Sequence, residues 1–218
     1  MKTKAVIFDL DGTLIDSLED IAVCMNEVLK EFDLPTHELH KYNHFVGDGA
    51  LFLTQRAVPQ NSSEELIQKV FKRYTKVYDA VLCENTSAYD GIYELLDILQ
   101  QEKIKLAVLS NKPHPFTCKY VETLFQEYAF LEVHGQKEDV PKKPHPMGAM
   151  NIAHALKLEP HEIFYVGDTP TDIKTAQAAQ MKSIGVLWGF RPKEELEEAG
   201  ADFLASTPLD IWDIIQKH

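Results

Sequence analysis

Cysteine and long apolar runs are both scarce in this chain. The three cysteines are scattered and odd in number, and no two of them form a CxxC pair. This pattern argues against a disulfide framework or a zinc knuckle and favours a reducing compartment, so we expect a cytoplasmic protein. The apolar run near the N-terminus ends at Asp9, which is too early for a secretory signal. No later stretch approaches the length of a membrane span, so we expect no membrane partner.

Basic residues are also scarce relative to acidic ones. Lys and Arg total 22 whereas Asp and Glu total 34, which gives a formal net charge of −12 at pH 7. Nucleic acids and anionic membranes need a basic surface, so neither is expected as the main partner. A phosphate site in such a chain would need local cations from side chains or from a metal. With 218 residues, 44% of them hydrophobic, the chain can form one domain, or one domain with a smaller insertion.

Three short apolar runs end abruptly in polar residues. They are "KAVIFDLD" (4–11), "IKLAVLSN" (104–111) and "EIFYVGDT" (162–169), and weaker runs follow at 181–189 and 201–206. Continuous rather than alternating apolarity indicates strands that are covered on both faces, as in a parallel sheet. Helical patterns separate these runs, at 90–103, 145–158 and 169–180. The alternation predicts an α/β fold with an open, three-layer α/β/α (Rossmann-like) parallel sheet.

Residues 17–84 interrupt this alternation with helical patterns alone. In "SLEDIAVCMNEVLKEF" (17–32) the apolar residues recur at helical spacing, and Ser17 and Asp20 have the spacing of a capping box. No strand pattern appears before the segment ends. We therefore predict a helical cap domain that is inserted into an α/β core, with the cap over 17–84 and the core formed by 1–16 and 85–218.

The three main apolar runs end in side chains that can bind a metal or a phosphate. These are Asp9 and Asp11, then Ser110 and Asn111, then Asp168 with Asp172 one helical turn later. The carboxyl ends of strands in an open α/β sheet border one crevice, so we expect these side chains to converge. Converging carboxylates repel one another unless a cation lies among them, and oxygen ligands without imidazole or thiolate favour Mg²⁺. Because Mg²⁺ often shares phosphate oxygens, a phosphorylated substrate is expected.

In these residues the sequence resembles the haloacid dehalogenase-like hydrolases, in the branch related to phosphoglycolate phosphatases with a helical cap. The resemblance covers essentially the whole chain and rests on four motifs, "DLDGT" (9–13), "LSNK" (109–112), "KKPHP" (142–146) and "GDTPTD" (167–172). It implies that Asp9 is a nucleophile that forms an aspartyl-phosphate and that Asp11 is the general acid and base. It also implies that Ser110, with Asn111 beside it, and Lys143 bind the phosphoryl group.

The resemblance further implies the metal ligands and a loop that selects the substrate. Mg²⁺ is expected on Asp9, Asp168 and the backbone carbonyl of Asp11, with Asp172 supporting the metal or Lys143. The stretch 45–57 looks like the cap loop of this branch. Asp48 and Arg56 in that stretch are therefore candidates for contact with the substrate.

Ordinary structural roles compete with several of these assignments. Thr169, Pro170 and Asp172 fit a capping box with proline at the first helical position, so Asp172 can serve the helix, the site or both. Lys143 can be a solvated loop lysine, and Lys142 stands directly beside it. The spacing of the "KPHP" motif is the only reason to prefer Lys143.

Three further residues have similar alternatives. Ser110 and Asn111 can end a strand and cap the next helix without touching a ligand. Arg56 can bind a substrate carboxylate through two parallel hydrogen bonds, or it can form a surface salt bridge. The family resemblance favours contact with phosphate for Ser110 and Asn111, whereas both roles of Arg56 stay open.

The sequence thus predicts a Mg²⁺-dependent phosphatase that acts on small phosphate monoesters. Phosphoglycolate is the first candidate substrate, by resemblance alone. Inorganic pyrophosphate, nucleoside monophosphates, sugar phosphates and pyridoxal phosphate are the alternatives within the enzyme class. A non-catalytic protein that binds a phosphate ligand in the same fold is the alternative from another class. The expected partner is a small phosphorylated metabolite, and the expected state is a monomer or a homodimer.

Overall fold

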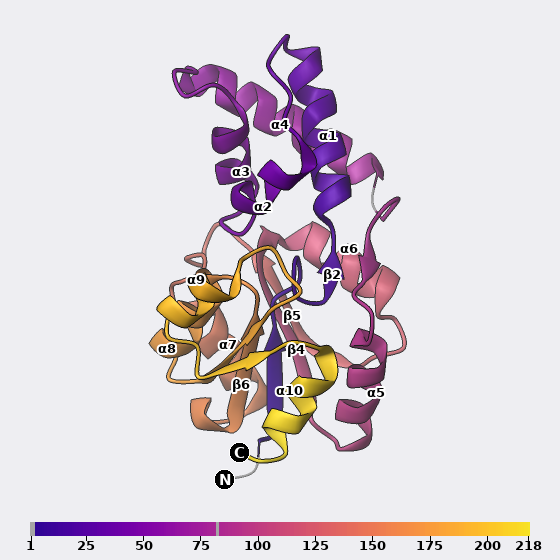
Figure 1. Ribbon diagram of the computed structural model, residues 1–218, viewed down its shortest axis with the longest axis vertical. Coiled ribbons are helices and arrows are strands. Elements are labelled where there is room, and N and C mark those ends of the chain that lie inside the picture. Colours follow the sequence, from indigo (N-terminus) through magenta and orange to yellow (C-terminus); the bar gives the residue numbers. More distant parts are fainter. Residues whose placement is uncertain (1–2, 82) are drawn as a thin grey trace.

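The computed structural model, which describes residues 3–81 and 83–218, contains a six-stranded parallel sheet (Figure 1). The strands lie in the order β5-β4-β1-β6-β7-β8, and every neighbouring pair is parallel. Their bounds are β1 Ala5–Phe8, β4 Lys105–Pro113, β5 Phe130–Gln136, β6 Ile163–Gly167, β7 Lys182–Val186 and β8 Phe203–Ala205. The sheet confirms the predicted α/β fold with an open parallel core.

β1 is an inner strand of this sheet, between β4 and β6. Residues 5–8 pair with residues 105–108 on one side and with residues 163–166 on the other. All four side chains of β1 are fully buried, because helices cover both faces of the sheet, and this explains the uninterrupted apolar run. The order of the strands reverses beside β1. The residues that follow β1, β4 and β6 therefore share one crevice at the carboxyl edge.

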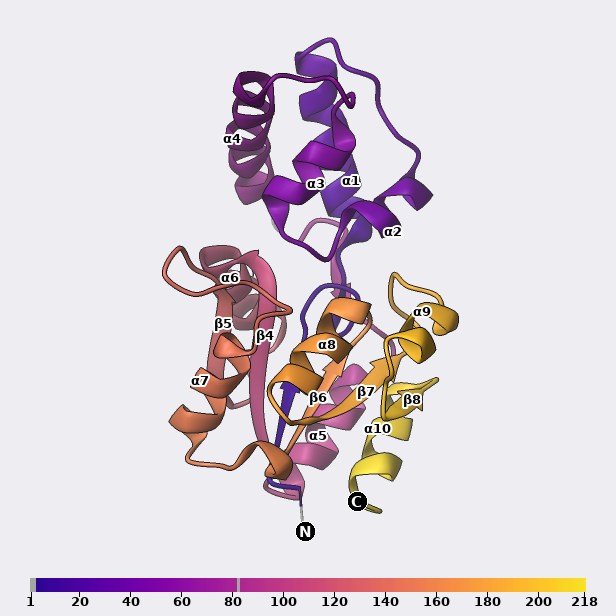
Figure 2. The same cartoon turned by 90° about the vertical axis from the view of Figure 1, so that its left-hand side faces the viewer.

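Helices form a layer on each face of the sheet (Figure 2). α5 (Ile92–Gln101) and α10 (Pro208–Ile215) pack against the face that carries Val6 and Phe8. α7 (Met147–Leu156) and α8 (Pro170–Ala178) pack against the opposite face. The remaining helices of this part are α6 His114–Leu124, α9 Lys193–Glu198 and the short η2 Pro160–Glu162. The two layers confirm the predicted α/β/α arrangement.

Further helices gather beyond the carboxyl edge of the sheet, at the top of Figures 1 and 2, and we call them the cap helices. They are α1 Leu18–Glu31, α2 Tyr42–Phe45, α3 Ala50–Ala57 and α4 Glu64–Val81, with the short η1 Leu39–Lys41 before α2. α4 buries Val70, Tyr74, Val77 and Tyr78, a stripe at helical spacing that faces its neighbours. The division into two domains at residues 17 and 84 stays a prediction.

The two chain segments that join the sheet to the cap helices pair with each other. β2 (Ile15–Asp16) and β3 (Ser87–Ala88) form a small antiparallel ribbon. The predicted capping box of α1 is wrong, because neither of its side chains caps the helix. The Ser17 hydroxyl donates to Asp11 instead, and Asp20 accepts hydrogen bonds from residues 85 and 86 in the second joining segment.

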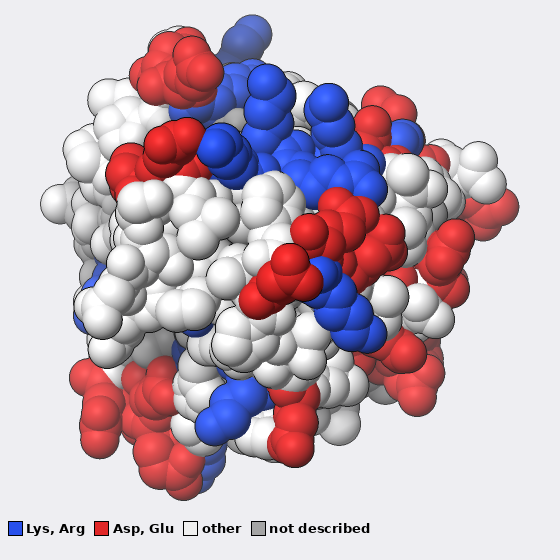
Figure 3. Space-filling model, turned by 90° about the horizontal axis from the view of Figure 1, so that it is seen from above, with Lys and Arg blue, Asp and Glu red and all other residues white. Residues whose placement is uncertain are grey.

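Charge is unevenly distributed over the surface. Viewed from the cap end, Lys and Arg side chains gather in one group, with acidic side chains around it (Figure 3). α4 contributes the exposed Lys69, Lys72 and Lys76 to the surface of the cap helices. Among the helices of residues 3–81 and 83–218, none combines the length and the apolarity that a membrane crossing requires.

Candidate active site

Asp9 is the first residue after the inner strand β1, and it is buried. Its backbone N–H donates to the carbonyl of Val166, which continues the pairing with β6 beyond the strand. Its Oδ1 accepts hydrogen bonds from the backbone N–H of Leu10 at 2.7 Å and from the ammonium of Lys143 at 2.9 Å. Among the described residues, none donates a hydrogen bond to Asp9 Oδ2. One oxygen is thus held in place, and the other is available to a ligand.

Lys143 extends into the same site from the loop before α7. Its Nζ lies 2.7 Å from Asp172 Oδ1 and 3.1 Å from the carbonyl of Leu109, and the side chain is 3% exposed. Burial lowers the pKa of Lys143, but the charges of Asp172 and Asp9 outweigh it and hold the pKa well above its usual value. Lys143 therefore brings a permanent positive charge to the cluster. The neighbouring Lys142 points elsewhere, to the carbonyl of Asp48.

Asp168 and Asp172 follow β6 and complete the acidic cluster. Asp172 Oδ2 accepts hydrogen bonds from the backbone N–H and the hydroxyl of Thr169, and these two residues form the predicted capping box of α8. The other oxygen, Oδ1, accepts a hydrogen bond from Lys143. Asp168 Oδ1 accepts from the hydroxyl of Thr13, and Oδ2 accepts from the backbone N–H of Phe190. Both roles that the sequence allowed for Asp172, at the helix and in the site, are thus present together.

The cluster has the composition of a site for a hard cation. Asp9, Asp168 and Asp172 are buried, and each offers an oxygen atom within 4.8 Å of the others. Burial raises the pKa of Asp9 to about 7 and that of Asp168 well above its usual value, because the charged forms lose water and repel one another. A divalent cation among these oxygens would favour the charged forms, and carboxylate oxygens are the ligands that hard cations prefer. The donor set therefore fits a metal.

Asp11 lies at the same edge but outside this cluster. Its Oδ1 accepts hydrogen bonds from the hydroxyl of Ser17 at 2.5 Å and from the ammonium of Lys112 at 2.8 Å. Gly12 follows with a φ of +83°, which glycine adopts without strain, and a side chain here would collide with Asp168. The tight turn at Gly12 lets the chain pass directly over the carboxylates.

Ser110 and Asn111 lie side by side at the end of β4, and both are buried. The Ser110 hydroxyl accepts the backbone N–H of Lys112. The Asn111 amide donates to the carbonyls of Lys143 and Gly47 and accepts the backbone N–H of Lys143, so it joins two loops that border the site. Asn111 therefore connects the loop of Lys143 to the loop of Gly47.

Asp48 and Arg56, the two candidate substrate contacts from the cap, form an ion pair with each other. Arg56 also donates to the carbonyl of Phe45, and Asp48 lies 3.5 Å from the hydroxyl of Thr171. Both side chains are about one-third exposed. Neither lines the cavity above Asp9.

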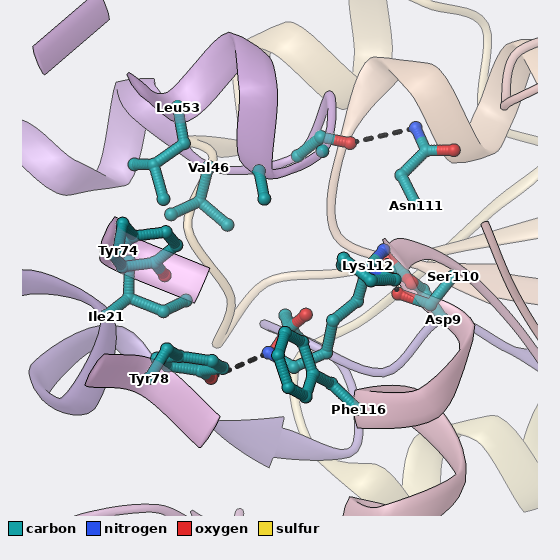
Figure 4. Close-up of a pocket in the computed structure, with 15 residues that line it drawn as sticks. Asp9, Ile21, Val46, Leu53, Tyr74, Tyr78, Ser110, Asn111, Lys112 and Phe116 are labelled. Atoms are coloured by element: carbon teal, nitrogen blue, oxygen red, sulfur yellow. Dashed lines mark hydrogen bonds and ion pairs between the residues drawn. The ribbon is translucent and has the colours of Figure 1, made fainter. Parts of the chain in front are cut away.

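That cavity, of about 50 Å³, separates the sheet edge from the cap helices (Figure 4). Its polar lining comes from Asp9, Asp11, Ser110, Asn111, Lys112, Tyr74 and Tyr78, and its apolar lining includes Ile21, Val46, Leu53 and Phe116. The side of the cavity toward the sheet is charged, whereas the cap side is mainly apolar with two phenols. A charged group bound at the carboxylates would thus point the rest of a ligand toward the cap helices.

Sequence reasoning missed Lys112 and Tyr78 as members of this site. Lys112 is the last letter of the "LSNK" motif, and it continues β4 by one residue beyond Asn111. Tyr78 belongs to the buried stripe of α4, where an aromatic residue ordinarily indicates a core position. A lysine inside the buried end of β4 was the available signal, since an unpaired ammonium is costly to bury.

Comparisons of the sequence and the fold with known proteins identify the family of this chain. Residues 6–186 match the family model described as haloacid dehalogenase-like hydrolase. A phosphoglycolate phosphatase of Mannheimia succiniciproducens is 28% identical over 219 residues, which cover 97% of this chain and 98% of the relative. The phosphoglycolate phosphatase of Escherichia coli K12 is also 28% identical, over 95% of this chain and 90% of the relative.

A solved structure is similar in fold along nearly the whole chain. It is a predicted phosphoglycolate phosphatase from Haemophilus somnus, with a TM-score of 0.92 and 28% sequence identity. The match covers 98% of each chain, so it includes both the sheet and the cap helices.

Proposed function

Because the chain belongs to the haloacid dehalogenase-like hydrolases, we propose that it hydrolyses small phosphate monoesters through an aspartyl-phosphate on Asp9. The family match and the relatives confirm the prediction of a phosphatase enzyme. One observation carries the chemical proposal. Asp9 binds Lys143 through one carboxylate oxygen, no described residue donates a hydrogen bond to its other oxygen, and Asp9 lines the cavity.

The proposed reaction has two steps. In the first, a carboxylate oxygen of Asp9 bonds to phosphorus as the bond between phosphorus and the leaving oxygen breaks, and Asp11 gives its proton to that oxygen. In the second, a water oxygen attacks phosphorus and gives its proton to Asp11, while the bond between Asp9 and phosphorus breaks. The products are an alcohol and inorganic phosphate, and Asp11 regains its proton.

Two side chains are proposed to bind the phosphoryl group, and two carboxylates with one backbone carbonyl are proposed to bind a metal near it. Lys143 and the Ser110 hydroxyl stabilise the negative charge on the phosphoryl oxygens, which is the main source of catalysis in phosphoryl transfer. Mg²⁺, when bound by Asp9, Asp168 and the backbone carbonyl of Asp11, supplies further positive charge to those oxygens. Asp172 supports this arrangement through Lys143, to which it is hydrogen-bonded.

The size of the cavity supports a small leaving group. A volume of about 50 Å³ has room for only a few water-sized groups. Phosphoglycolate is the first candidate, because it is the substrate in the names of the relatives. Pyrophosphate, nucleoside monophosphates, sugar phosphates and pyridoxal phosphate are the alternatives, and Asp48 and Arg56 are proposed to select among them once their ion pair opens.

The remaining proposals concern the setting of the reaction. We propose a cytoplasmic enzyme that acts as a monomer or a homodimer on a small phosphorylated metabolite. The three scattered cysteines and the net charge of −12 support this setting and argue against nucleic acid as a partner.

Phosphate release from a panel of esters tests the proposed function. The panel contains phosphoglycolate, pyrophosphate, a nucleoside monophosphate, a sugar phosphate, pyridoxal phosphate and an aryl phosphate, each with Mg²⁺ and with chelator. We expect Mg²⁺-dependent release, with phosphoglycolate fastest, and a loss of at least about 10³-fold in Asp9→Asn. The exposed Asp33→Asn variant is the control and should retain activity. Release from none of the esters by the folded, Mg²⁺-loaded protein would instead favour a non-catalytic phosphate-binding protein.

A further inference from the structure

Lys112 places a buried ammonium between the sheet edge and the cap helices. Its side chain is 5% exposed, and its Nζ donates to Asp11 Oδ1 at 2.8 Å and to the hydroxyl of Tyr78 at 2.7 Å (Figure 4). Asp11 follows β1 and Lys112 lies near the end of β4, whereas Tyr78 lies on the cap helix α4. One side chain therefore connects Asp11 to the cap.

Aromatic rings enclose the same ammonium. Nζ of Lys112 lies 4.7 Å from the ring centre of Tyr78 and 4.6 Å from that of Tyr120, and the two phenol oxygens are 2.8 Å apart. Ring faces attract a cation, but a buried ammonium still needs an opposite charge close to it. Among the described residues, the carboxylate of Asp11 is the one that pairs with Lys112.

The two buried lysines of the site have separate partners. Lys143 binds Asp9 and Asp172, whereas Lys112 binds Asp11. Ser17 and Lys112 both donate to the same oxygen of Asp11, so this carboxyl is fixed from two directions. No described residue donates to Asp11 Oδ2, and Asp11 lines the cavity. The second oxygen is therefore the one that can exchange a proton with a ligand.

We propose that Lys112 is the positioning residue for the general acid and base Asp11, and that its hydrogen bond to Tyr78 makes this position depend on the cap. The inference rests on the proposed role of Asp11. When the cap lies as in this structure, Tyr78 and Lys112 together hold Asp11 so that Oδ2 faces the leaving oxygen. When Tyr78 moves away with α4, Lys112 loses one of its two hydrogen-bond acceptors and gains freedom to move, so Asp11 is held less firmly.

The dependence of the rate on the leaving group tests this role. An alkyl phosphate releases a strongly basic alkoxide that needs the proton of Asp11, whereas a nitrophenyl phosphate releases a stable phenolate that needs none. Because kcat/KM reports the first step, in which Asp9 takes the phosphoryl group, it separates the two cases. A misplaced Asp11 lowers kcat/KM for the alkyl ester and leaves that for the aryl ester unchanged.

We would measure both values with Mg²⁺ in wild type, Lys112→Met, Asp11→Asn and Lys119→Met. Lys119→Met is the matched control, since Lys119 also joins a core helix to α4, through Asp79, but does not contact Asp11. For Lys112→Met we expect kcat/KM for the alkyl ester to fall by about 10- to 100-fold, with the aryl ester at the wild-type value. Lys119→Met should match wild type with both esters.

The slow second step gives an independent readout. If Lys112→Met also misplaces Asp11 as a base, the aryl ester should give a burst of nitrophenol close to one per active site, followed by slow turnover. Tyr78→Phe, which removes one hydroxyl and keeps the ring, should change both readouts in the same direction by a smaller factor. This variant preserves the test if Lys112→Met does not fold, as judged by its thermal melting.

Either of two results would overturn the inference. If Lys112→Met lowers kcat/KM equally with both esters, Lys112 binds the substrate or stabilises the fold. If Lys112→Met keeps the wild-type kcat/KM with both esters, Lys112 does not position Asp11. Asp11→Asn separates this failure from failure of the proposed function. If Asp11→Asn retains activity on the alkyl ester, the proposed acid is wrong, whatever Lys112 does.

Discussion

The carboxyl group of Asp9 combines two demands that conflict in the absence of a metal. In the proposed reaction it must be ionised to attack phosphorus, yet burial and the neighbouring acids raise its pKa to about 7. Lys143 offsets part of this cost through the contact at 2.9 Å. Ionisation of Asp9 in the folded protein therefore still costs free energy. This cost predicts how the free energy of unfolding changes with pH when no divalent cation is bound.

We expect the metal-free protein to lose stability as the pH rises from about 4 to 7. The unfolded carboxyl has a pKa of 3.8 and the folded one about 7, so in this range the folded state holds the proton more strongly and unfolding releases it. The free energy of unfolding therefore falls with rising pH, by at most about 1.4 kcal/mol per pH unit for this group. Urea titrations with chelator at several pH values measure the slope, and added Mg²⁺ should reverse it near pH 7.

The variant Asp9→Asn provides the control for this effect. An amide does not titrate, so the metal-free variant should show a shallower slope and greater stability than wild type above pH 7. Equal slopes in the two proteins would assign the pH dependence to other groups.

The residues of the acidic cluster could be predicted from the sequence, whereas the contacts between the site and the cap helices could not. Asp9, Asp168 and Asp172 follow strands whose apolar runs are unmistakable, and the open-sheet rule places such residues together. The pairing of Lys112 with Tyr78 depends on how α4 packs over the sheet, which no local pattern specifies. The same holds for Asp48 and Arg56, whose mutual ion pair is set by the shape of one loop.

At the scale of elements, the joint between the sheet and the cap helices is braced in two ways. The β2–β3 ribbon pairs the two chain segments that join the sheet to the cap helices. Beside it, the fully buried carboxyl of Asp20 accepts from the backbone and side-chain amides of Asn85 and from the hydroxyl of Thr86. Helix α1 is thereby fastened to the segment through which the chain returns to the core.

Removal of this carboxyl should weaken the whole fold. For Asp20→Ala we expect a loss of about 2–4 kcal/mol in the free energy of unfolding, because three donors in or near a buried position lose their acceptor. The neighbouring Glu19→Ala, at an exposed position of the same helix turn, should change stability by less than about 0.5 kcal/mol. Urea denaturation measures both, and similar values for the two variants would contradict the bracing role.

The elements themselves were predictable in proportion to their burial. β1, β4 and β6 are buried on both faces and stand out as continuous apolar runs. β5 was missed, since an edge strand contacts only one neighbour and its residues in "FLEVHGQ" are mostly half-buried. The capping box of α1 was misassigned because Ser17 and Asp20 have long-range partners, which outweigh the local spacing.

At the scale of the whole molecule, side chains of the core bind backbone carbonyls of α2 and of the loop between α2 and α3. The Arg191 guanidinium donates to the carbonyls of Asn43 and Val46, Lys142 donates to the carbonyl of Asp48, and Asn111 donates to that of Gly47. These contacts use backbone oxygens, so they depend on the position of the loop and little on its side chains. Together they keep the cap helices close to the sheet.

The Arg191→Ala variant should therefore release the cap. Two hydrogen bonds from a charged donor are lost, each worth about 1.5–3 kcal/mol, so we expect a larger radius of gyration and a fall in kcat/KM of about 10-fold or more for the preferred ester. Small-angle X-ray scattering and steady-state kinetics measure the two effects. Arg73→Ala is the control, because Arg73 binds Glu31 within the cap helices. An unchanged radius in Arg191→Ala would show that the other contacts suffice.

The position of β1 within the sheet also has a consequence for the order of assembly during synthesis. β1 is synthesised before the other strands of the sheet, yet its neighbours begin near residues 105 and 163, so it cannot pair until about half of this sequence has been made. The cap helices emerge in that interval and contact one another locally. Non-local pairing of this kind slows folding. The apolar run that leads to Asp9, the proposed nucleophile, is therefore also the segment that stays unpaired longest in the newborn chain.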